Sequence, residues 1–460
     1  MSKQMSVTSK KPAGKAIVRV LGCKVNQAEA AAMAKILENR GYRVDPETQD
    51  PDLVLINTCC VTAKAEGKSR RTVGSLAQRF PHARIVVTGC LAEINPTSLQ
   101  GLGADTVVLG TYEKDRFEEF ADRGSLPDGA PECGLNPRTR DFVDLGAPGI
   151  PQRARAFLKV QDGCNQHCTY CIVPKARGRS RSMHPERVLS HAGKLSLAGH
   201  AEIVLTGIHL GSYGRDLDRP LRLEDLVEEL LSRCPAARFR MSSIEPQEIT
   251  TRLIDLTARH ERLCSHFHIP LQSGDDAILK RMRRPYDAAA VTALTRTIID
   301  KVPEACIGLD VMVGFPGEDE RSFRRTVDLI VSTGAAYLHV FPFSPRPGTP
   351  AADFKPLVPA ATSQERVAEL RRISKELRRR FYSRFIGRVM SVVLESDSLS
   401  PAGTLTARTD NYIPVRLRSS DRIPKDGAFL VTLEGPADDQ VRASTAPPEP
   451  AAVSPRKARP

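Results

Sequence analysis

The chain has 460 residues, of which 41% are hydrophobic and 26% are charged, a composition typical of globular proteins. It is too long for a single hydrophobic core, so we expect two to four domains. Lys and Arg exceed Asp and Glu by 13 charges, which excludes an acidic protein and favours a polyanionic partner such as nucleic acid.

The ends of the chain and its cysteines indicate where the protein works. No apolar run approaches the length of a membrane span, and residues 1–15 lack the apolar segment of a secretory signal. We therefore expect a flexible tail and a cytoplasmic protein without a membrane partner. The eleven cysteines are an odd number, which favours metal ligation in a reducing compartment over a disulfide framework.

Residues 16–124 have the alternating pattern of a parallel, doubly wound α/β domain. We expect apolar strands at residues 16–21, 53–56 and 84–87. A helix is expected at residues 28–40, with Asn26 as its cap. Since the carboxyl ends of parallel strands meet at one edge of a sheet, whatever follows these strands should converge there.

A cysteine follows each of these three strands. Cys23, Cys59 and Cys90 stand directly after them, and Gly22 and Gly89 leave room for a bulky group. Three converging thiolates predict an iron–sulfur cluster. The alternative for any one of them is an ordinary buried cysteine.

A Pro- and Gly-rich linker is expected at residues 125–155, where Cys133 has no assigned role. The strand and helix alternation then resumes over residues 156–362. Strands are expected at residues 157–160, 202–205, 238–242, 266–270, 307–313 and 337–343. Helices are expected at residues 185–197, 223–232, 275–283, 288–299 and 320–331. Six such units predict a partial barrel whose active site lies at the carboxyl ends of the strands.

The most informative motif follows the first strand of this barrel. Cys164, Cys168 and Cys171 have the spacing C-x3-C-x2-C. Three clustered thiolates without an obvious fourth ligand fit a 4Fe–4S cluster that leaves one iron open. A zinc knuckle or a set of buried thiols is the alternative.

Other residues of the barrel domain are weaker candidates. His268 could be a functional histidine or a hydrogen-bonded core histidine. Arg177, Arg179 and Arg181 alternate along the chain and would share one face of an extended segment, where they could bind substrate phosphates or a carboxylate, or form a solvated charge run. The remaining cysteines of this domain are expected to be packing residues: Cys234, Cys264 and Cys306.

The C-terminal part begins with a basic helix at residues 363–388, which we expect to contact RNA or to bridge domains. Strands at residues 390–395, 404–409, 412–415 and 429–433 then predict a small antiparallel barrel over residues 389–442. Residues 443–460 are rich in Pro and Ala and are expected to be disordered.

The motifs together resemble those of the radical S-adenosylmethionine (SAM) methylthiotransferases. The resemblance lies in residues 22–27, 57–59, 88–90 and 161–178, and it extends over residues 16–441. It places the second-cluster ligand at Cys59 and leaves the adjacent Cys60 without a role. The C-terminal barrel resembles a TRAM domain, an RNA-binding module.

This resemblance implies two 4Fe–4S clusters and SAM as cofactors. Cys164, Cys168 and Cys171 would hold the SAM-binding cluster, and Cys23, Cys59 and Cys90 the sulfur-carrying cluster. The residues implied in SAM binding are Tyr170, Thr206, Gly207, Ser243, Asp310 and Gly314. No general base can be assigned from the sequence.

Within the family, residues 22–27 and 172–178 look most like the branch that acts on threonylcarbamoyladenosine beside the anticodon of tRNA. The implied product carries a methylthio group on carbon 2 of the adenine. The reaction would also need an electron donor and a sulfur source, which the sequence does not identify. The alternatives are isopentenyl-adenosine in tRNA, an aspartate of a ribosomal protein, or a non-catalytic RNA-binding iron–sulfur sensor.

Overall fold

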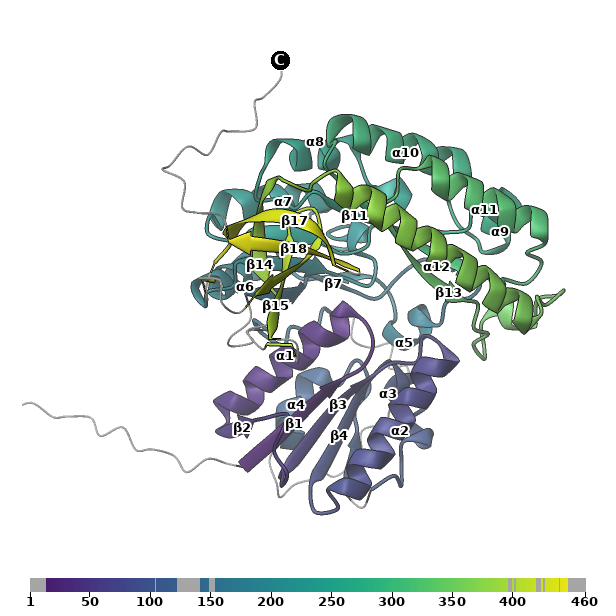
Figure 1. Cartoon of the computed structure of the whole chain (residues 1–460). Coiled ribbons are helices and arrows are strands. Elements are labelled where there is room, and N and C mark those ends of the chain that lie inside the picture. The colour runs from purple at the N-terminus through teal and green to yellow at the C-terminus, as the bar shows by residue number, and fades with distance from the viewer. Residues whose placement is uncertain are drawn as a thin grey trace, which may run out of the picture. The chain divides into compact units, whose positions relative to one another are not determined.

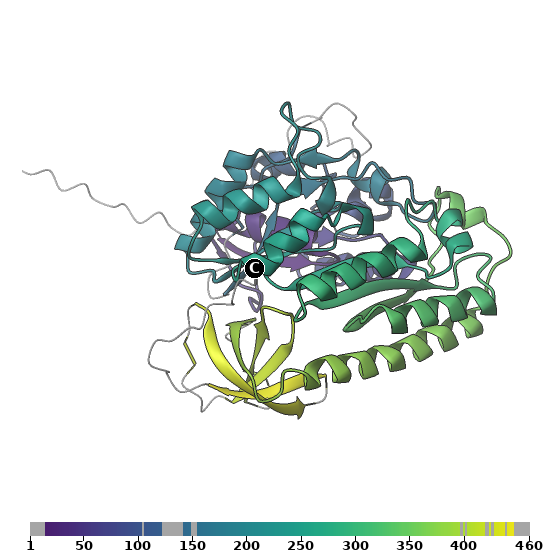
Figure 2. The same ribbon diagram turned by 90° about the horizontal axis from the view of Figure 1, so that it is seen from above.

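The chain folds into two compact units (Figures 1 and 2). Unit 1 comprises Met1–Gly149 and Ile172–Arg179, and unit 2 comprises Ile150–Cys171 and Ser180–Pro460. We expected residues 172–179 in the barrel domain, whereas they pack with unit 1. The computed structural model describes residues 14–103, 105–121, 141–148, 154–395, 399–400, 403–418, 423–424, 427–437 and 439–445. Most of the expected N-terminal tail, linker and C-terminal tail lies outside these residues, as does Cys133.

Unit 1 is built on a parallel five-stranded sheet with the order β2-β1-β3-β4-β5. Its strands are β1 (Gly14–Val20), β2 (Tyr42–Val44), β3 (Leu53–Thr58), β4 (Arg84–Gly89) and β5 (Thr106–Val108). Its helices are α1 (Lys24–Asn39), α2 (Ala63–Arg79), α3 (Cys90–Ile94), α4 (Phe117–Ala121) and α5 (Val173–Arg177). The three expected strands are confirmed, and β2 and β5 are short edge strands that the sequence did not predict.

Both faces of this sheet are covered, because side chains alternate along each strand. Leu55 of β3 packs in one cluster with Met33 of α1, and Ile56 packs in another with Val73 of α2. The doubly wound architecture is therefore confirmed. It brings the carboxyl ends of β1, β3 and β4 together at one edge.

The start of α1 differs from the prediction. The helix begins at Lys24, with Cys23 as its N-cap residue, so Asn26 lies within the first turn. Its side chain donates hydrogen bonds to the backbone oxygens of Leu21 (2.7 Å) and Thr58 (2.9 Å). Asn26 thus ties the turn after β1 to the end of β3, since its buried amide satisfies carbonyls that the strands leave unpaired.

Unit 2 contains two parallel three-stranded sheets with the orders β10-β9-β6 and β11-β12-β13. Their strands are β6 (Arg155–Lys159), β9 (Glu202–Thr206), β10 (Arg238–Met241), β11 (His266–Gln272), β12 (Cys306–Val313) and β13 (Tyr337–Pro342). A parallel bridge between Phe239 and Leu263 and a hydrogen bond from Ile244 N to His268 O (3.0 Å) join the two sheets. These six strands are those predicted for the partial barrel.

Helices cover this partial barrel. They are α6 (Pro185–Leu197), α7 (Leu223–Arg233), α8 (Thr251–Arg259), α9 (Asp276–Arg281), α10 (Ala288–Lys301) and α11 (Glu320–Ser332). A short antiparallel pair, β7 (Gln161–Asp162) and β8 (Arg181–Ser182), flanks the segment that the chain sends to unit 1. Among the described residues, we find no helix long and apolar enough to cross a membrane.

The C-terminal part is a long helix followed by a closed barrel (Figure 2). The helix α12 spans Ala360–Ser383, and the barrel order is β14-β15-β16-β18-β17. Its strands are β14 (Val389–Leu394), β15 (Thr404–Thr409), β16 (Pro414–Arg418), β17 (Phe429–Ala437) and β18 (Gln440–Thr445). The predicted small barrel is confirmed, although β16 begins two residues later than expected and β18 enters the stretch assigned to a disordered tail.

A buried cluster of charges joins this barrel to the β10-β9-β6 sheet. The fully buried carboxylate of Glu202 accepts hydrogen bonds from Arg155 (2.7 Å), Arg238 (2.8 Å) and Arg240 (2.8 Å). Burial would raise the pKa of Glu202, but the three guanidinium groups hold it well below the usual range.

The same arginines reach the turn between β15 and β16. Arg238 donates to the backbone oxygen of Arg408 (2.8 Å), and Arg240 donates to those of Thr409 (2.9 Å) and Asp410 (2.8 Å). The joint between the two parts of unit 2 therefore combines these contacts of arginine side chains to backbone with side-chain contacts, such as the ion pair of Arg155 with Glu395 and the stacking of Tyr412 on His266.

Candidate active site

Three cysteines meet at the carboxyl edge of the unit 1 sheet. β1, β3 and β4 end in register, and Cys23, Cys59 and Cys90 follow within three residues of the last paired positions. Cys59 and Cys90 are each 4% exposed, whereas Cys23 is exposed. Burial and the neighbouring thiol of Cys90 raise the pKa of Cys59 to about 12. The structure thus brings together the three thiols that the strand ends predicted.

The backbone at Gly22 passes close to the Cys59 thiol. Gly22 has a φ of 101°, and a Cβ added there would lie 2.8 Å from Cys59 Cβ and 3.0 Å from its sulfur. The next cysteine, Cys60, is fully buried in the core cluster that contains Ile56 and Val87. The two adjacent cysteines therefore have different environments, and a three-thiolate donor set, with Gly22 letting the backbone lie close to Cys59, suits an iron–sulfur cluster.

A buried arginine lies next to these thiols. Arg177, on α5, is 0% exposed, and its Nε donates to the sulfur of Cys90 at 3.4 Å. Its two Nη groups donate to Glu29 (3.0 and 3.2 Å), and one also donates to Asn26 Oδ1 (2.6 Å). Lys114 Nζ donates to the same Glu29 carboxylate at 2.6 Å. The sequence proposed Arg177 as a substrate contact, whereas its guanidinium is taken up inside unit 1.

The other two arginines of that run are placed differently. Arg179 is exposed at the end of the unit 1 segment, and Arg181 is buried in β8 of unit 2, 3.9 Å from the Asp162 carboxylate. The expectation that the three share one face is wrong, because α5 is helical and Gly178 reverses the chain with a φ of 67°.

The C-x3-C-x2-C motif lies in unit 2, after β6 and β7. The sulfur of Cys164 lies 3.6 Å from His209 Nδ1, and His209 Nε2 lies 2.9 Å from a carboxylate oxygen of Glu248. Burial alone would lower the pKa of His209, but its hydrogen bonds to Cys164 and Glu248 raise it to about 10. An imidazolium therefore stands next to the first thiol of the motif.

A second cation stands next to the middle thiol. Arg284 Nη1 donates to the sulfur of Cys168 at 3.0 Å and also pairs with the carboxylate of Glu245. Cys168 is buried, while Cys164 and Cys171 are partly exposed. Cationic neighbours stabilise thiolates, which are the form that binds metal. The donor set and its charges therefore fit a cluster at this position too.

The residues implied in SAM binding lie near the carboxyl ends of the strands in unit 2. Thr206 ends β9, Gly314 follows β12, and Tyr170 packs edge-on against Phe315 with ring centroids 6.4 Å apart. Gly207 admits no side chain, because a Cβ there would lie 2.7 Å from Gln161 Oε1. The placement agrees with an active site at this edge.

Known proteins resemble this chain along most of its length. Residues 15–110 match the model of uncharacterized protein family UPF0004, and residues 158–330 match that of the radical SAM superfamily. The threonylcarbamoyladenosine tRNA methylthiotransferase MtaB of Bacillus subtilis is 36% identical over 87% of this chain and 90% of that protein. The MtaB protein of Thermotoga maritima is 34% identical over 82% of this chain and 86% of that protein.

The chain belongs to the radical SAM methylthiotransferase family. A further member, the tRNA-2-methylthio-N(6)-dimethylallyladenosine synthase of Desulfitobacterium hafniense, is 32% identical over 89% of this chain and 92% of its own. Among solved structures, the radical SAM methyltransferase TsrM of Kitasatospora setae has a TM-score of 0.54 at 18% identity, with 73% of this chain and 75% of that chain covered. That likeness shows the fold.

Family membership makes the protein a SAM-dependent transferase that uses SAM and a 4Fe–4S cluster.

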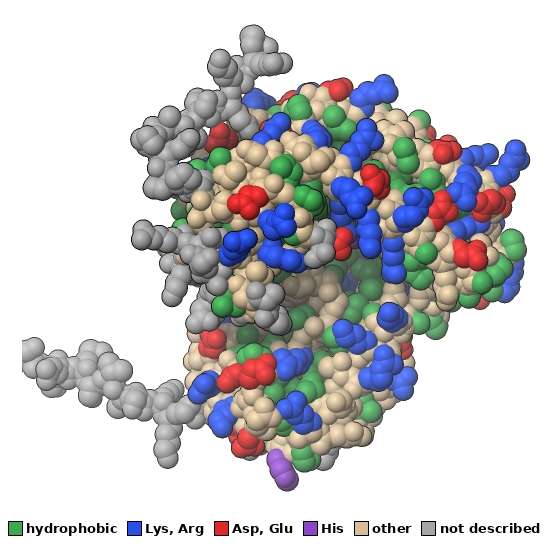
Figure 3. Space-filling model, in the orientation of Figure 1, with side chains coloured by type: hydrophobic (Ala, Val, Ile, Leu, Met, Phe, Trp, Pro, Cys, Tyr) green, Lys and Arg blue, Asp and Glu red, His purple; other side chains and the backbone are tan. Residues whose placement is uncertain are grey.

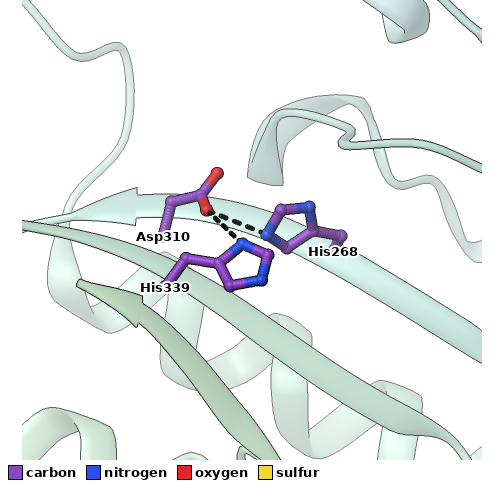
Figure 4. Close-up of side chains that lie close together, drawn as sticks. All are labelled: His268, Asp310 and His339. Carbon is purple, nitrogen blue, oxygen red and sulfur yellow. Dashed lines mark hydrogen bonds and ion pairs between the residues drawn. The ribbon is translucent and has the colours of Figure 1, made fainter. Parts of the chain in front are cut away.

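The structure of this methylthiotransferase also groups three polar side chains that the sequence did not bring together. His268, Asp310 and His339 project from the neighbouring strands β11, β12 and β13 and point toward one another (Figure 4). We refer to them as the His–Asp–His cluster. The sequence left His268 undecided, assigned Asp310 to SAM, and gave no role to His339. Residue spacing gives no signal for this cluster, because the register of β12 and β13 brings Asp310 and His339 together.

A basic groove lies between α12 and the C-terminal barrel. Its volume is about 570 Å³, and its charged lining residues on the helix are Lys375, Arg378 and Arg379. Tyr382 of α12 and the exposed Ile386, which follows the helix, also line the groove. Lys and Arg side chains gather over α12 (Figure 3). A cationic groove with an aromatic ring suits a phosphate backbone with nearby bases or ribose.

Proposed function

We propose that this methylthiotransferase adds a methylthio group to carbon 2 of threonylcarbamoyladenosine next to the anticodon of tRNA. The observation that carries this proposal is the similarity, at 36% and 34% identity, to two proteins named for that substrate over more than four-fifths of the chain. The basic groove on α12 supports a tRNA partner, because clustered Lys and Arg side chains bind phosphates.

Two 4Fe–4S clusters are part of the proposal. Cys164, Cys168 and Cys171 would hold one, and the unit 1 thiols, Cys23, Cys59 and Cys90, would hold the other. When bound, the first supplies the electron that cleaves SAM to methionine and a 5′-deoxyadenosyl radical, and the second supplies the sulfur that is methylated and transferred.

The protein's own residues prepare both sites. Arg284 and His209 lie next to Cys168 and Cys164, and Arg177 lies next to Cys90, so each set of thiols faces at least one cation that favours the thiolate form. Glu29 and Glu245 hold the two guanidinium groups in place through charge-assisted hydrogen bonds.

SAM would lie at the carboxyl edge of the unit 2 strands. Its contacts would come from Tyr170, Thr206, Gly207, Ser243, Asp310 and Gly314. Of the arginines that follow the cysteine motif, exposed Arg179 is the one available to a substrate phosphate or carboxylate. An electron donor and a sulfur source would have to be supplied by other molecules.

Mass spectrometry of tRNA nucleosides from a deletion strain tests the substrate. Loss of the methylthio form of threonylcarbamoyladenosine, restored by the intact gene, is the expected result. Persistence of that nucleoside in a strain without a second such enzyme would refute the proposal. Reconstitution under argon with dithionite and SAM tests the enzyme itself, since an RNA-binding sensor would form no 5′-deoxyadenosine.

A second candidate substrate is dimethylallyladenosine, because a protein named for its methylthiolation is 32% identical to this chain. Two synthetic anticodon stem-loops that differ in the adenosine side chain separate the candidates. We expect methylthiolation of the threonylcarbamoyl RNA at a higher kcat/KM. The reverse preference would reassign the substrate.

A further inference from the structure

The His–Asp–His cluster has a defined geometry on the inner face of the β11-β12-β13 sheet. His268 Nε2 lies 2.9 Å from Asp310 Oδ1, and His339 Nδ1 lies 3.2 Å from the same oxygen (Figure 4). Ser243, after β10, fixes the other nitrogen of His268 at 2.7 Å. Register places Asp310 directly opposite His339 on paired strands, so the contact is built into the sheet.

The cluster is closed on one side and open on the other. Toward the amino ends of the strands, His266 hydrogen-bonds to Tyr337 (2.9 Å) and stacks on Tyr412, with ring centroids 4.1 Å apart. The His268 side chain is 7% exposed, that of Asp310 is 20% exposed, and that of His339 is 52% exposed. A molecule could therefore reach His339 from the carboxyl edge, where the cysteine motif also lies.

Two polar atoms of the cluster take no part in its hydrogen bonds. Among the residues that the structure describes, His339 Nε2 and the second carboxylate oxygen of Asp310 have no hydrogen-bond partner. Because a carboxylate only accepts, His339 Nδ1 donates to Asp310, and Nε2 is left as the ring nitrogen that can bond to a ligand. The imidazole is thus held in one orientation with its remaining nitrogen free.

The surroundings of the open side are apolar. Met312 and Phe341, each two residues beyond a cluster member on its strand, belong to a group that includes Phe315, Phe343 and Tyr170. Tyr170 lies between Cys168 and Cys171 in the sequence. A ligand that fits both this apolar group and the His–Asp–His cluster has a flat ring system and a polar side chain. A purine with a hydrogen-bonding N6 substituent is such a ligand.

We propose that His339, oriented by Asp310, is the residue that selects the threonylcarbamoyl side chain of the substrate adenosine over an apolar dimethylallyl side chain. This inference rests on the proposed function. The threonyl hydroxyl is a donor that pairs with His339 Nε2. A dimethylallyl group can neither donate nor accept a hydrogen bond and would cover this nitrogen without giving it a partner.

The size of the expected effect follows from the cost of covering a polar atom without giving it a partner. A site built to hydrogen-bond a substrate hydroxyl discriminates strongly against an analogue that lacks it. With one such contact, replacing His339 should lower kcat/KM for the threonylcarbamoyl RNA by about 10-fold to 100-fold.

The test uses the reconstituted full-length enzyme and the two stem-loop RNAs. His339→Phe should lose 10-fold or more in kcat/KM on the threonylcarbamoyl RNA and gain relative activity on the dimethylallyl RNA. His339→Asn, which keeps a hydrogen-bonding group at a half-exposed position, should retain part of the preference. His260→Phe, an exposed histidine that follows α8, is the matched control and should keep the wild-type ratio.

Three results would overturn the inference. An unchanged ratio of the two kcat/KM values in His339→Phe, with methylthiolation of the threonylcarbamoyl RNA intact, would refute the role of His339 and leave the proposed function standing. A wild-type enzyme that modifies neither RNA, or the dimethylallyl RNA alone, would refute both. Binding of one Zn²⁺ or Mn²⁺ by the holoenzyme that is lost in His339→Phe would show that the cluster binds metal, since its three ligand atoms lie within 4.8 Å of one another.

Discussion

The two cysteine sites differ in how the sequence builds them and agree in how charge surrounds them. In unit 2 the thiols come from one eight-residue segment, whereas in unit 1 they come from the ends of three strands. Each site nevertheless has a buried arginine against a thiol: Arg284 at 3.0 Å from Cys168, and Arg177 at 3.4 Å from Cys90. In each, a glutamate holds that arginine.

The second cation distinguishes them. In unit 2 it is His209, which touches the thiol of Cys164 itself. In unit 1 it is Lys114, which touches Glu29 and so acts on the thiols through the Glu29–Arg177 pair. The comparison suggests that a local motif can use nearby side chains directly, while a site assembled from distant strands needs a buried network to hold its parts together.

The largest expected effect separates the two sites outright. Replacing Cys23, Cys59 and Cys90 with Ala should leave about half of the iron of a two-cluster protein and preserve 5′-deoxyadenosine formation, without methylthiolated product. Replacing Cys164, Cys168 and Cys171 should also leave half of the iron but abolish 5′-deoxyadenosine.

Iron analysis and product chromatography measure both outcomes. Cys60→Ala is the control, because Cys60 is buried in the core next to a proposed ligand. Full iron content in the first triple variant would contradict the unit 1 assignment.

The buried network of unit 1 gives the next effect. Arg177→Leu should lower the free energy of unfolding of the cluster-free protein by about 3 kcal/mol, because it breaks a fully buried ion pair and leaves Asn26 and Cys90 without their donor. Arg179→Leu, at an exposed position of the same segment, should change it by less than about 0.5 kcal/mol. Urea unfolding followed by circular dichroism measures the difference, and equal midpoints for the two variants would count against the network.

A smaller effect tests the space around the unit 1 thiols. Gly22→Ala would place a Cβ 2.8 Å from Cys59 Cβ and should reduce iron retention as well as stability. Gly101→Ala is the matched control, because Gly101 also has a positive φ, of 74°, but has nothing within 4 Å of the added Cβ. It should show only the backbone strain of about 1 kcal/mol. Equal iron content in both variants would mean that Gly22 is needed for its conformation alone.

The smallest effect concerns pH and the unit 2 site. The pKa of His209, about 10 in the cluster-free protein, lies above its ordinary value of 6.5. The stability that protonated His209 contributes should therefore be complete below pH 6.5 and be lost as the pH rises toward 10. Urea midpoints of the cluster-free protein between pH 6.5 and 10 should fall more steeply than those of His209→Gln. Parallel curves would show that His209 is not protonated next to Cys164.

The parts of the fold that could be predicted are those with long apolar runs. β3 and β4 are buried along their whole length, and each contains a run of aliphatic residues, at 53–56 and 85–87. The edge strands β2 and β5 have three residues each and carry no such signal. α8 was missed because its polar residues, beginning after the capping Thr250, obscure the apolar face formed by Leu253 and Ile254.

The residues of the candidate sites also divide into those whose placement could be predicted from the sequence and those whose placement could not. That six of the cysteines fall into two groups was predictable, because three have a local spacing and three follow recognisable strands. The contacts of Arg177 could not be predicted, since they depend on α5 packing with unit 1 after the chain has already entered unit 2. The place of His339 in the His–Asp–His cluster could not be predicted either. Its contact with Asp310 is set by the register of β12 and β13, which residue spacing does not determine.

The joint between the C-terminal barrel and the β10-β9-β6 sheet has a consequence for how this protein could vary. Arg238 and Arg240 bind the backbone oxygens of residues 408–410, not their side chains. An insertion that moves these carbonyls would leave two buried guanidinium groups short of acceptors. The side chains of Asn411 and Tyr412 also cross the joint, to Glu304 and His266. A barrel taken from another RNA-modifying enzyme should therefore be accepted here only if this one turn keeps both its path and these two side chains.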